Sequence, residues 1–178
     1  WGLFKKMIIA DNCAEIANTI FYSPADYSAS TLVLGAVFFA FQIYGDFSGY
    51  SDIAIGTARL FGFNLMKNFS FPYFSRDIAE FWRRWHISLS TWFRDYVYIP
   101  LGGSKTSKAK QIRNVFIVFL VSGFWHGANW TFIIWGILHG IGLVLHKILN
   151  RYNLIKFLSS KYLNIFLTFN YISFLWVF

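Results

Sequence analysis

Two of the four histidines stand in sequence contexts that suit acid–base chemistry. His86 ends the run Phe81-Trp82-Arg83-Arg84-Trp85-His86, and His126 lies within Gly123-Phe124-Trp125-His126-Gly127. In surroundings this rich in tryptophan, or in glycine, an imidazole loses water, stays neutral near pH 7 and can accept a proton. His86 and His126 are therefore the candidate catalytic residues, with purely structural roles for both as the alternative.

The other histidines and the single cysteine favour structural roles. His146 borders a basic segment and is expected at a membrane interface, while His139 lies in an apolar helix and is expected to hydrogen-bond across helices. No metal site is predicted, because the histidines lack i, i+4 spacing and there is no cysteine cluster. Cys13 is expected to fill space in a helix. Of the serines, neither Ser48 nor Ser51 has the two flanking glycines of a hydrolase nucleophile elbow.

Asp46 and Asp52 lie beside an apolar segment. An intramembrane carboxylate costs about 2.5–3.5 kcal/mol on insertion scales, so it usually has a partner or a function. The favoured interpretation is that both aspartates cap helices at a membrane interface.

The composition indicates that much of the chain lies in lipid. Of the 178 residues, 56% are apolar and 13% are charged, whereas a soluble domain has about 25% charged residues. Residues 27–45, 114–146 and 162–178 carry no charge at all, which predicts membrane segments. These features argue against disorder, a disulfide scaffold and a cytosolic globule.

The net charge of +8 is better explained by membrane-surface loops than by nucleic acid, because the basic residues are scattered between apolar runs. After Asp95 there are no acidic residues, and the bases fall within residues 105–113 and 147–161. The positive-inside rule places both clusters on the cytoplasmic face.

The uncharged stretch between these clusters predicts a hairpin. Residues 114–146 would span about 50 Å as one helix, against a hydrocarbon core of about 30 Å, and are too short for two full spans. Two short or tilted helices fit better, with His126-Gly127-Ala128-Asn129 as a buried turn at mid-membrane. The spacings Gly123/Gly127 and Gly136/Gly140 would let the helices approach closely.

The other elements are also expected to be helices. A mixed helix is predicted over Leu3 to Phe21, an apolar helix over Ser28 to Tyr44, and a further helix over Ile53 to Phe63 after the segment 45–52. Residues 64–75 are expected to form a loop.

An amphipathic helix is predicted from Asp77, which suits an N-cap with Glu80 three residues on, to Phe93. Arg83 and Arg84 lie opposite its apolar stripe and are candidates to hold phosphates of a cofactor or an interfacial lipid, with snorkelling to headgroups as the alternative. The fold class is thus all-α, a polytopic membrane protein with short or re-entrant helices and an amphipathic interfacial helix.

Several ordered motifs resemble those of the membrane-bound O-acyltransferase family, in particular its bacterial polysaccharide subgroup, which acts in alginate O-acetylation. They are Gly2-Leu3-Phe4-Lys5-Lys6, Gln42-Ile43-Tyr44-Gly45-Asp46-Phe47-Ser48-Gly49-Tyr50-Ser51-Asp52, the run from Phe81 to Ser90, the stretch from Arg94-Asp95-Tyr96 to Gly103, and Gly123-Phe124-Trp125-His126-Gly127. The resemblance covers about residues 1–150 and extends to residue 178 as one partial domain, truncated at both ends.

The resemblance implies a multi-pass enzyme of the bacterial inner membrane that moves an acetyl group from a thioester, acetyl-CoA, to a hydroxyl. It implies that His126 is the family's essential histidine and that His86 occupies its second polar position. It also implies periplasmic acetyltransferase partners and an exported polysaccharide as acceptor, without identifying that polysaccharide. No permanently bound cofactor is expected.

Two other functions remain as alternatives. A proton-coupled transporter or channel could be lined by His126, His139, Asp46 and Asp52. A non-catalytic membrane scaffold for a periplasmic acetyltransferase would need none of these side chains for chemistry.

Overall fold

The computed structural model describes residues 1–152 and 160–178. In this part of the chain all regular elements are helices and no strand occurs, which confirms the all-α prediction. The chain forms two compact units. The first comprises Trp1–Phe69 with Asn170–Val177, and the second comprises Ser70–Phe169 with Phe178. Part of the basic segment 147–161, Lys156 included, lies outside the described residues.

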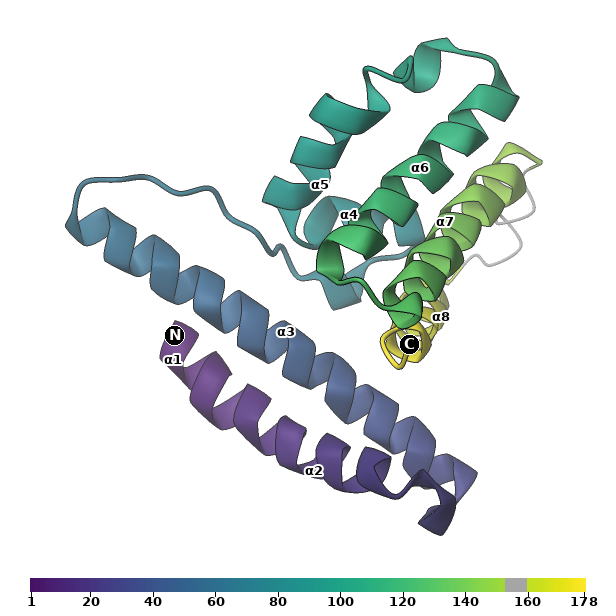
Figure 1. Cartoon of the computed structure of the whole chain (residues 1–178). Helices are drawn as coiled ribbons and strands as arrows, with labels where there is room; N and C mark the ends of the chain where they lie inside the picture. Colours follow the sequence, from purple (N-terminus) through teal and green to yellow (C-terminus); the bar gives the residue numbers. More distant parts are fainter. Residues whose placement is uncertain (153–159) are drawn as a thin grey trace. The chain divides into compact units, whose positions relative to one another are not determined.

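In the first unit an N-terminal helical segment runs beside one long helix (Figure 1). It consists of α1 (Gly2–Phe4), a π-helical stretch (Lys5–Ala10) and α2 (Asp11–Tyr22), and a short 3-10 turn (Pro24–Asp26) leads to α3 (Ala29–Leu60). The two backbones touch where small residues meet, since a Cβ atom at position 2 would lie 2.6 Å from the carbonyl oxygen of Gly49. Glycine is therefore required at this crossing.

The helix α3 is continuous where the sequence predicted a break. The expectation that Asp46 and Asp52 cap helix ends is wrong, because both lie within α3. Their charges are instead paired with the preceding helical segment: the Lys5 ammonium lies 2.8 Å from a carboxylate oxygen of Asp52, and Lys6 pairs with Asp46 at 2.5 Å. A paired carboxylate does not need a helix end to be stabilised.

The second unit contains the segment predicted as one amphipathic helix. A 3-10 turn (Pro72–Phe74) precedes α4 (Ile78–Arg84) and α5 (Ile87–Phe93), followed by a π-helical stretch (Arg94–Tyr98) and a 3-10 turn (Gly103–Lys105). The predicted N-cap is confirmed: the Asp77 carboxylate accepts a hydrogen bond from the backbone N–H of Glu80 at 2.7 Å. The predicted continuity to Phe93 is wrong, because the helix breaks between Arg84 and Ile87.

The predicted hairpin is confirmed. The helices α6 (Lys108–His126) and α7 (Trp130–Arg151) are joined by Gly127-Ala128-Asn129. They pack through their glycines, since a Cβ atom at position 123 would lie 2.3 Å from the carbonyl oxygen of Phe132 and one at position 136 would lie 2.4 Å from that of Phe119. The C-terminal helix α8 (Lys161–Leu175) follows.

The helices α3 and α7 are each long and apolar enough to cross a membrane. The end of α7 lies beside the start of α6, because the contacts of Gly123, Gly136 and Gly140 across the hairpin run in antiparallel order. The two basic clusters thus belong to the same end of the hairpin, while their side of the membrane remains a prediction.

Candidate active site

His86 occupies the break between α4 and α5, not the rigid helix that the sequence predicted. Trp85 is extended and His86 adopts a left-handed backbone with φ 42° and ψ 57°. A left-handed residue other than glycine costs about 1–2 kcal/mol, and such strain tends to collect at functional sites. The imidazole is half-buried.

Neighbouring serines stabilise this break. The backbone N–H of Ser70 donates to the carbonyl oxygen of Arg84 at 3.0 Å, and the hydroxyl of Ser90 donates to that of Trp85 at 3.2 Å. The carbonyl oxygen of His86 accepts the N–H of Ser90 at 3.0 Å and so begins α5. These bonds satisfy carbonyl groups that would otherwise be orphaned at the end of α4.

His126 is the last residue of α6, beside the loop that joins the hairpin. Its ring packs edge-on against Trp135 with 5.1 Å between ring centroids, and it stacks on Phe132 at 6.0 Å. The side chain is exposed in this chain, and burial of the turn within a membrane stays a prediction. The helix ends at His126, because Gly127 follows in an extended conformation, and the imidazole stays accessible.

The structure brings the two candidate histidines together around Trp125. The centroid of the Trp125 ring lies 6.4 Å from that of His86 and 5.0 Å from that of His126. Burial, and to a smaller extent the proximity of the His126 imidazole, lowers the pKa of His86 to about 4. His86 is therefore a neutral imidazole at pH 7.

His139 belongs to the same aromatic cluster, and the sequence analysis did not predict that it lies near His126. It is fully buried in α7 and its ring centroid lies 4.6 Å from that of Trp135 and 5.0 Å from that of Trp82. Because Trp135 also contacts His126, the two histidines share one neighbour. The spacing Trp135, His139 on one helix face was the signal available in the sequence.

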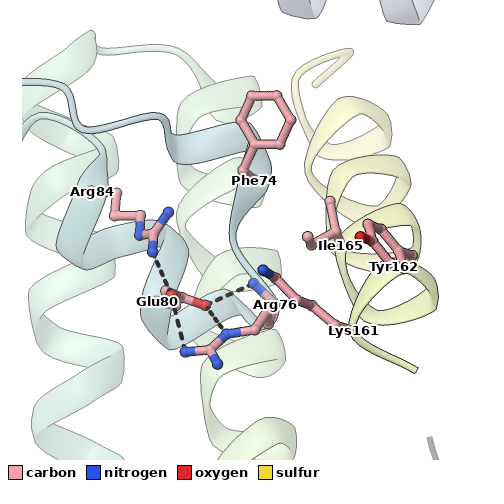
Figure 2. A pocket seen from close by; sticks show the side chains of 7 residues that line it. All are labelled: Phe74, Arg76, Glu80, Arg84, Lys161, Tyr162 and Ile165. Carbon is pink, nitrogen blue, oxygen red and sulfur yellow. Dashed lines mark hydrogen bonds and ion pairs between the residues drawn. The ribbon is translucent and has the colours of Figure 1, made fainter. Parts of the chain in front are cut away.

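Arg83 and Arg84 do not act as a pair in the structure. Arg83 is exposed, whereas a guanidinium nitrogen of Arg84 lies 2.6 Å from a carboxylate oxygen of buried Glu80. Arg76 contacts the same carboxylate at 3.0 Å. These groups line a pocket of about 530 Å³ with Phe74, Lys161, Tyr162 and Ile165 (Figure 2). The sequence interpretation missed Arg76 and Lys161.

No group of three or more histidine, cysteine, aspartate or glutamate side chains that could hold a metal ion occurs within residues 1–152 and 160–178.

The model of the membrane-bound O-acyltransferase family matches residues 1–178. The chain belongs to this family. Among its relatives, the peptidoglycan O-acetyltransferase of Helicobacter pylori is 46% identical over 178 residues, which cover 99% of this chain and 34% of the relative. The probable alginate O-acetylase AlgI of Pseudomonas aeruginosa is 50% identical over 148 residues, covering 83% of this chain and 28% of the relative.

A more distant relative carries a different name. The teichoic acid D-alanyltransferase of Bacillus subtilis is 32% identical over an alignment 190 residues long, which covers 97% of this chain and 47% of that protein. The chain spans about a third of the length of the more similar relatives. Membership of this acyltransferase family agrees with the two helices that could cross a membrane.

Proposed function

We propose that the protein containing this chain is a membrane O-acyltransferase that moves an acetyl group from acetyl-CoA towards hydroxyls of an exported polysaccharide. The observation that carries this proposal is the meeting of His86 and His126 around Trp125 in a chain of the membrane-bound O-acyltransferase family. Relatives named for peptidoglycan and alginate O-acetylation support an acetyl group and a polysaccharide acceptor.

His126 acts as the general base in this mechanism. A neutral hydroxyl attacks a thioester slowly, so removal of its proton as it attacks lowers the barrier. The hydroxyl oxygen bonds to the acetyl carbonyl carbon while its proton passes to the imidazole of His126. The carbon–sulfur bond then breaks, and the leaving thiolate takes the proton back to form free CoA. The exposed side chain of His126, beside the turn of the hairpin, suits a group that must meet an acceptor.

His86 stabilises the oxyanion or orients the thioester. A neutral imidazole donates one hydrogen bond, and the lowered pKa of His86 keeps that form at pH 7. A donor aimed at the developing negative charge is a strong contribution to acyl transfer. The hydrogen bonds from Ser70 and Ser90 hold the backbone that carries His86 more firmly than a flexible loop would.

The setting of the reaction is part of the same proposal. The donor binds from the cytoplasm, with Arg83 and Arg84 as candidate contacts to its phosphates, and the acetyl group leaves outward to periplasmic acetyltransferase partners. The protein lies in the bacterial inner membrane as a multi-pass protein. The acceptor at the end of this route is alginate, peptidoglycan or another exported polysaccharide.

Replacement of His126 in the whole purified protein tests the proposal with labelled acetyl-CoA. His126→Ala is expected to lower acetyl transfer and acetyl-CoA hydrolysis by about 10²–10⁴, the usual loss for a general base. His146→Ala is the matched control, because His146 lies on α7 beside Asp77, at 3.6 Å, outside the aromatic cluster. Near-normal turnover by folded His126→Ala protein would overturn the mechanism.

Two further outcomes would favour the alternatives. Complex assembly and polysaccharide acetylation that survive His126→Ala would indicate a scaffold. Proton-coupled transport without acyl transfer would indicate a transporter, although Asp46 and Asp52, which such a path would use, already have lysine partners.

A further inference from the structure

The pocket beside α4 combines a charged floor with an apolar wall. Its floor is the carboxylate of Glu80, which is 6% exposed and receives the guanidinium groups of Arg76 and Arg84 (Figure 2). Its wall is formed by Phe74 before α4 and by Tyr162 and Ile165 on α8. Both sides of the pocket belong to the second unit.

The pocket carries an excess of positive charge. Three cationic side chains, Arg76, Arg84 and Lys161, face one carboxylate, which leaves two positive charges. Burial alone would raise the pKa of Glu80, but the hydrogen bonds from Arg76 and the charges of both arginines lower it overall, so Glu80 stays ionised and holds them in place. Lys161 reaches from α8 toward Arg76 in the view of Figure 2. A preordered cluster of this kind suits a phosphate group.

The apolar wall indicates that the phosphate carries an acyl chain. Phe74 is 65% exposed and Tyr162 is 80% exposed, so both present bare aromatic surface beside the cations. A free phosphate or sugar phosphate would leave this surface in water, whereas a phospholipid would cover it with its first methylene groups.

The position of the pocket agrees with a lipid. Asp77, next to Arg76, lies 3.6 Å from His146 near the end of α7, and Lys147 lies over the ring of Tyr98 at 6.0 Å. The pocket thus lies at the basic end of the hairpin, where anionic headgroups of the cytoplasmic leaflet gather. We infer that this pocket binds the phosphate of an anionic phospholipid, with Arg76 and Lys161 as its main contacts. The inference does not depend on the proposed acetyl transfer.

Retention of lipid by the whole protein tests this inference. The protein is extracted from nanodiscs of mixed phosphatidylglycerol and phosphatidylethanolamine, and the bound lipids are counted by native mass spectrometry. Wild-type protein is expected to enrich phosphatidylglycerol. Arg76→Gln and Lys161→Gln are each expected to lower that enrichment about fivefold, the loss for one basic contact near a membrane surface.

Lys108→Gln and Lys110→Gln are the matched controls, because both are exposed basic residues on the first turn of α6 outside the pocket. Equal loss of phosphatidylglycerol in control and pocket variants would overturn the inference, since it would show nonspecific attraction. Lys161 is exposed, so its variant is expected to fold even where Arg76→Gln does not.

Competition with soluble probes separates a lipid from the other source of phosphate. Free CoA and inorganic phosphate, each added in large excess over the protein, are expected to leave phosphatidylglycerol bound. Displacement of the lipid by CoA, lost in Lys161→Gln, would overturn the lipid assignment and give the pocket to the acyl donor. Phe74→Ser is expected to lower lipid retention without changing the response to either soluble probe.

Discussion

His86 combines a strained backbone with a chemical role that an amide could partly replace. Asparagine can donate a hydrogen bond and tolerates the left-handed conformation better than most residues, whereas alanine offers neither. We therefore expect His86→Asn to retain more acetyl transfer than His86→Ala, with the smaller loss in kcat. Steady-state kinetics of the whole protein in detergent measure this difference.

His86→Gly is the control for the backbone. Glycine relieves the left-handed strain but supplies no hydrogen bond, so activity as low as that of His86→Ala at higher thermal stability would assign the loss to the missing imidazole. Equal losses from Asn, Ala and Gly would remove the hydrogen-bonding role from His86 while leaving that of His126 untouched.

The lowered pKa of His86 also predicts a pH dependence of stability. The folded protein binds this proton only near pH 4, while the unfolded chain binds it near pH 6.5, so the unfolded state holds more protons between these values. Stability from this group is therefore present above pH 6.5 and lost as pH falls toward 4. Between pH 7 and pH 5 the melting temperature should fall more in wild-type protein than in His86→Asn. An equal fall in both proteins would contradict the assignment.

The sequence made His86 and His126 the candidate catalytic residues, but it did not show how they meet. Trp and Gly contexts around His86 and His126 indicated desolvated imidazoles, and their motifs resembled a known family. The left-handed turn at His86 has no local signal, because neither glycine nor proline marks it. Two serines distant in sequence from each other, Ser70 and Ser90, stabilise it, and such a tertiary effect overrides helical periodicity.

At the scale of elements, the hairpin α6–α7 depends on glycines that admit a neighbouring backbone. A Cβ atom at position 123 would overlap the carbonyl oxygen of Phe132 at 2.3 Å, and backbone cannot rotate away as a side chain can. Gly123→Ala is expected to lower the free energy of unfolding by about 1–3 kcal/mol, the usual cost of overpacking. Thermal unfolding of the whole protein in detergent measures it.

Gly56→Ala is the matched control. Gly56 also lies within a helix, but a Cβ atom there would meet nothing within 4 Å. Alanine has the higher helix propensity, so this change is expected to be neutral or slightly stabilising. Similar losses at positions 56 and 123 would show that chain flexibility, not close packing, explains the effect.

The sequence predicted elements well where length and charge constrained them. Uncharged residues 114–146 were too long for one span and too short for two, which predicted a hairpin. The low helix propensity of Gly127 and Asn129 predicted the place of its turn, and the structure confirms both. The interruption expected at residues 45–52 was wrong because its evidence was local. Lys5 and Lys6 are about forty residues away in the chain, and no pattern within α3 reveals them.

For the whole molecule, the hairpin predicts that its two basic ends share one face of the membrane. Single cysteines at Lys108 and Arg151 are expected to react from the cytoplasmic side with a membrane-impermeant maleimide, since basic loops are retained there. A cysteine at Ala128, in the turn, is the control and should not share their labelling pattern. Labelling of positions 108 and 151 from opposite sides would contradict the hairpin in the membrane.

The two lysine–aspartate pairs of the first unit bear on how this protein is made. Asp46 and Asp52 lie in a helix apolar enough to cross the bilayer, where each carboxylate alone costs about 2.5–3.5 kcal/mol on insertion. Their partners, Lys5 and Lys6, precede them in the chain and so leave the ribosome first. The N-terminal segment is therefore present before α3 is synthesised, and the two helices can pass from the translocon into lipid together with these two lysine–aspartate pairs formed.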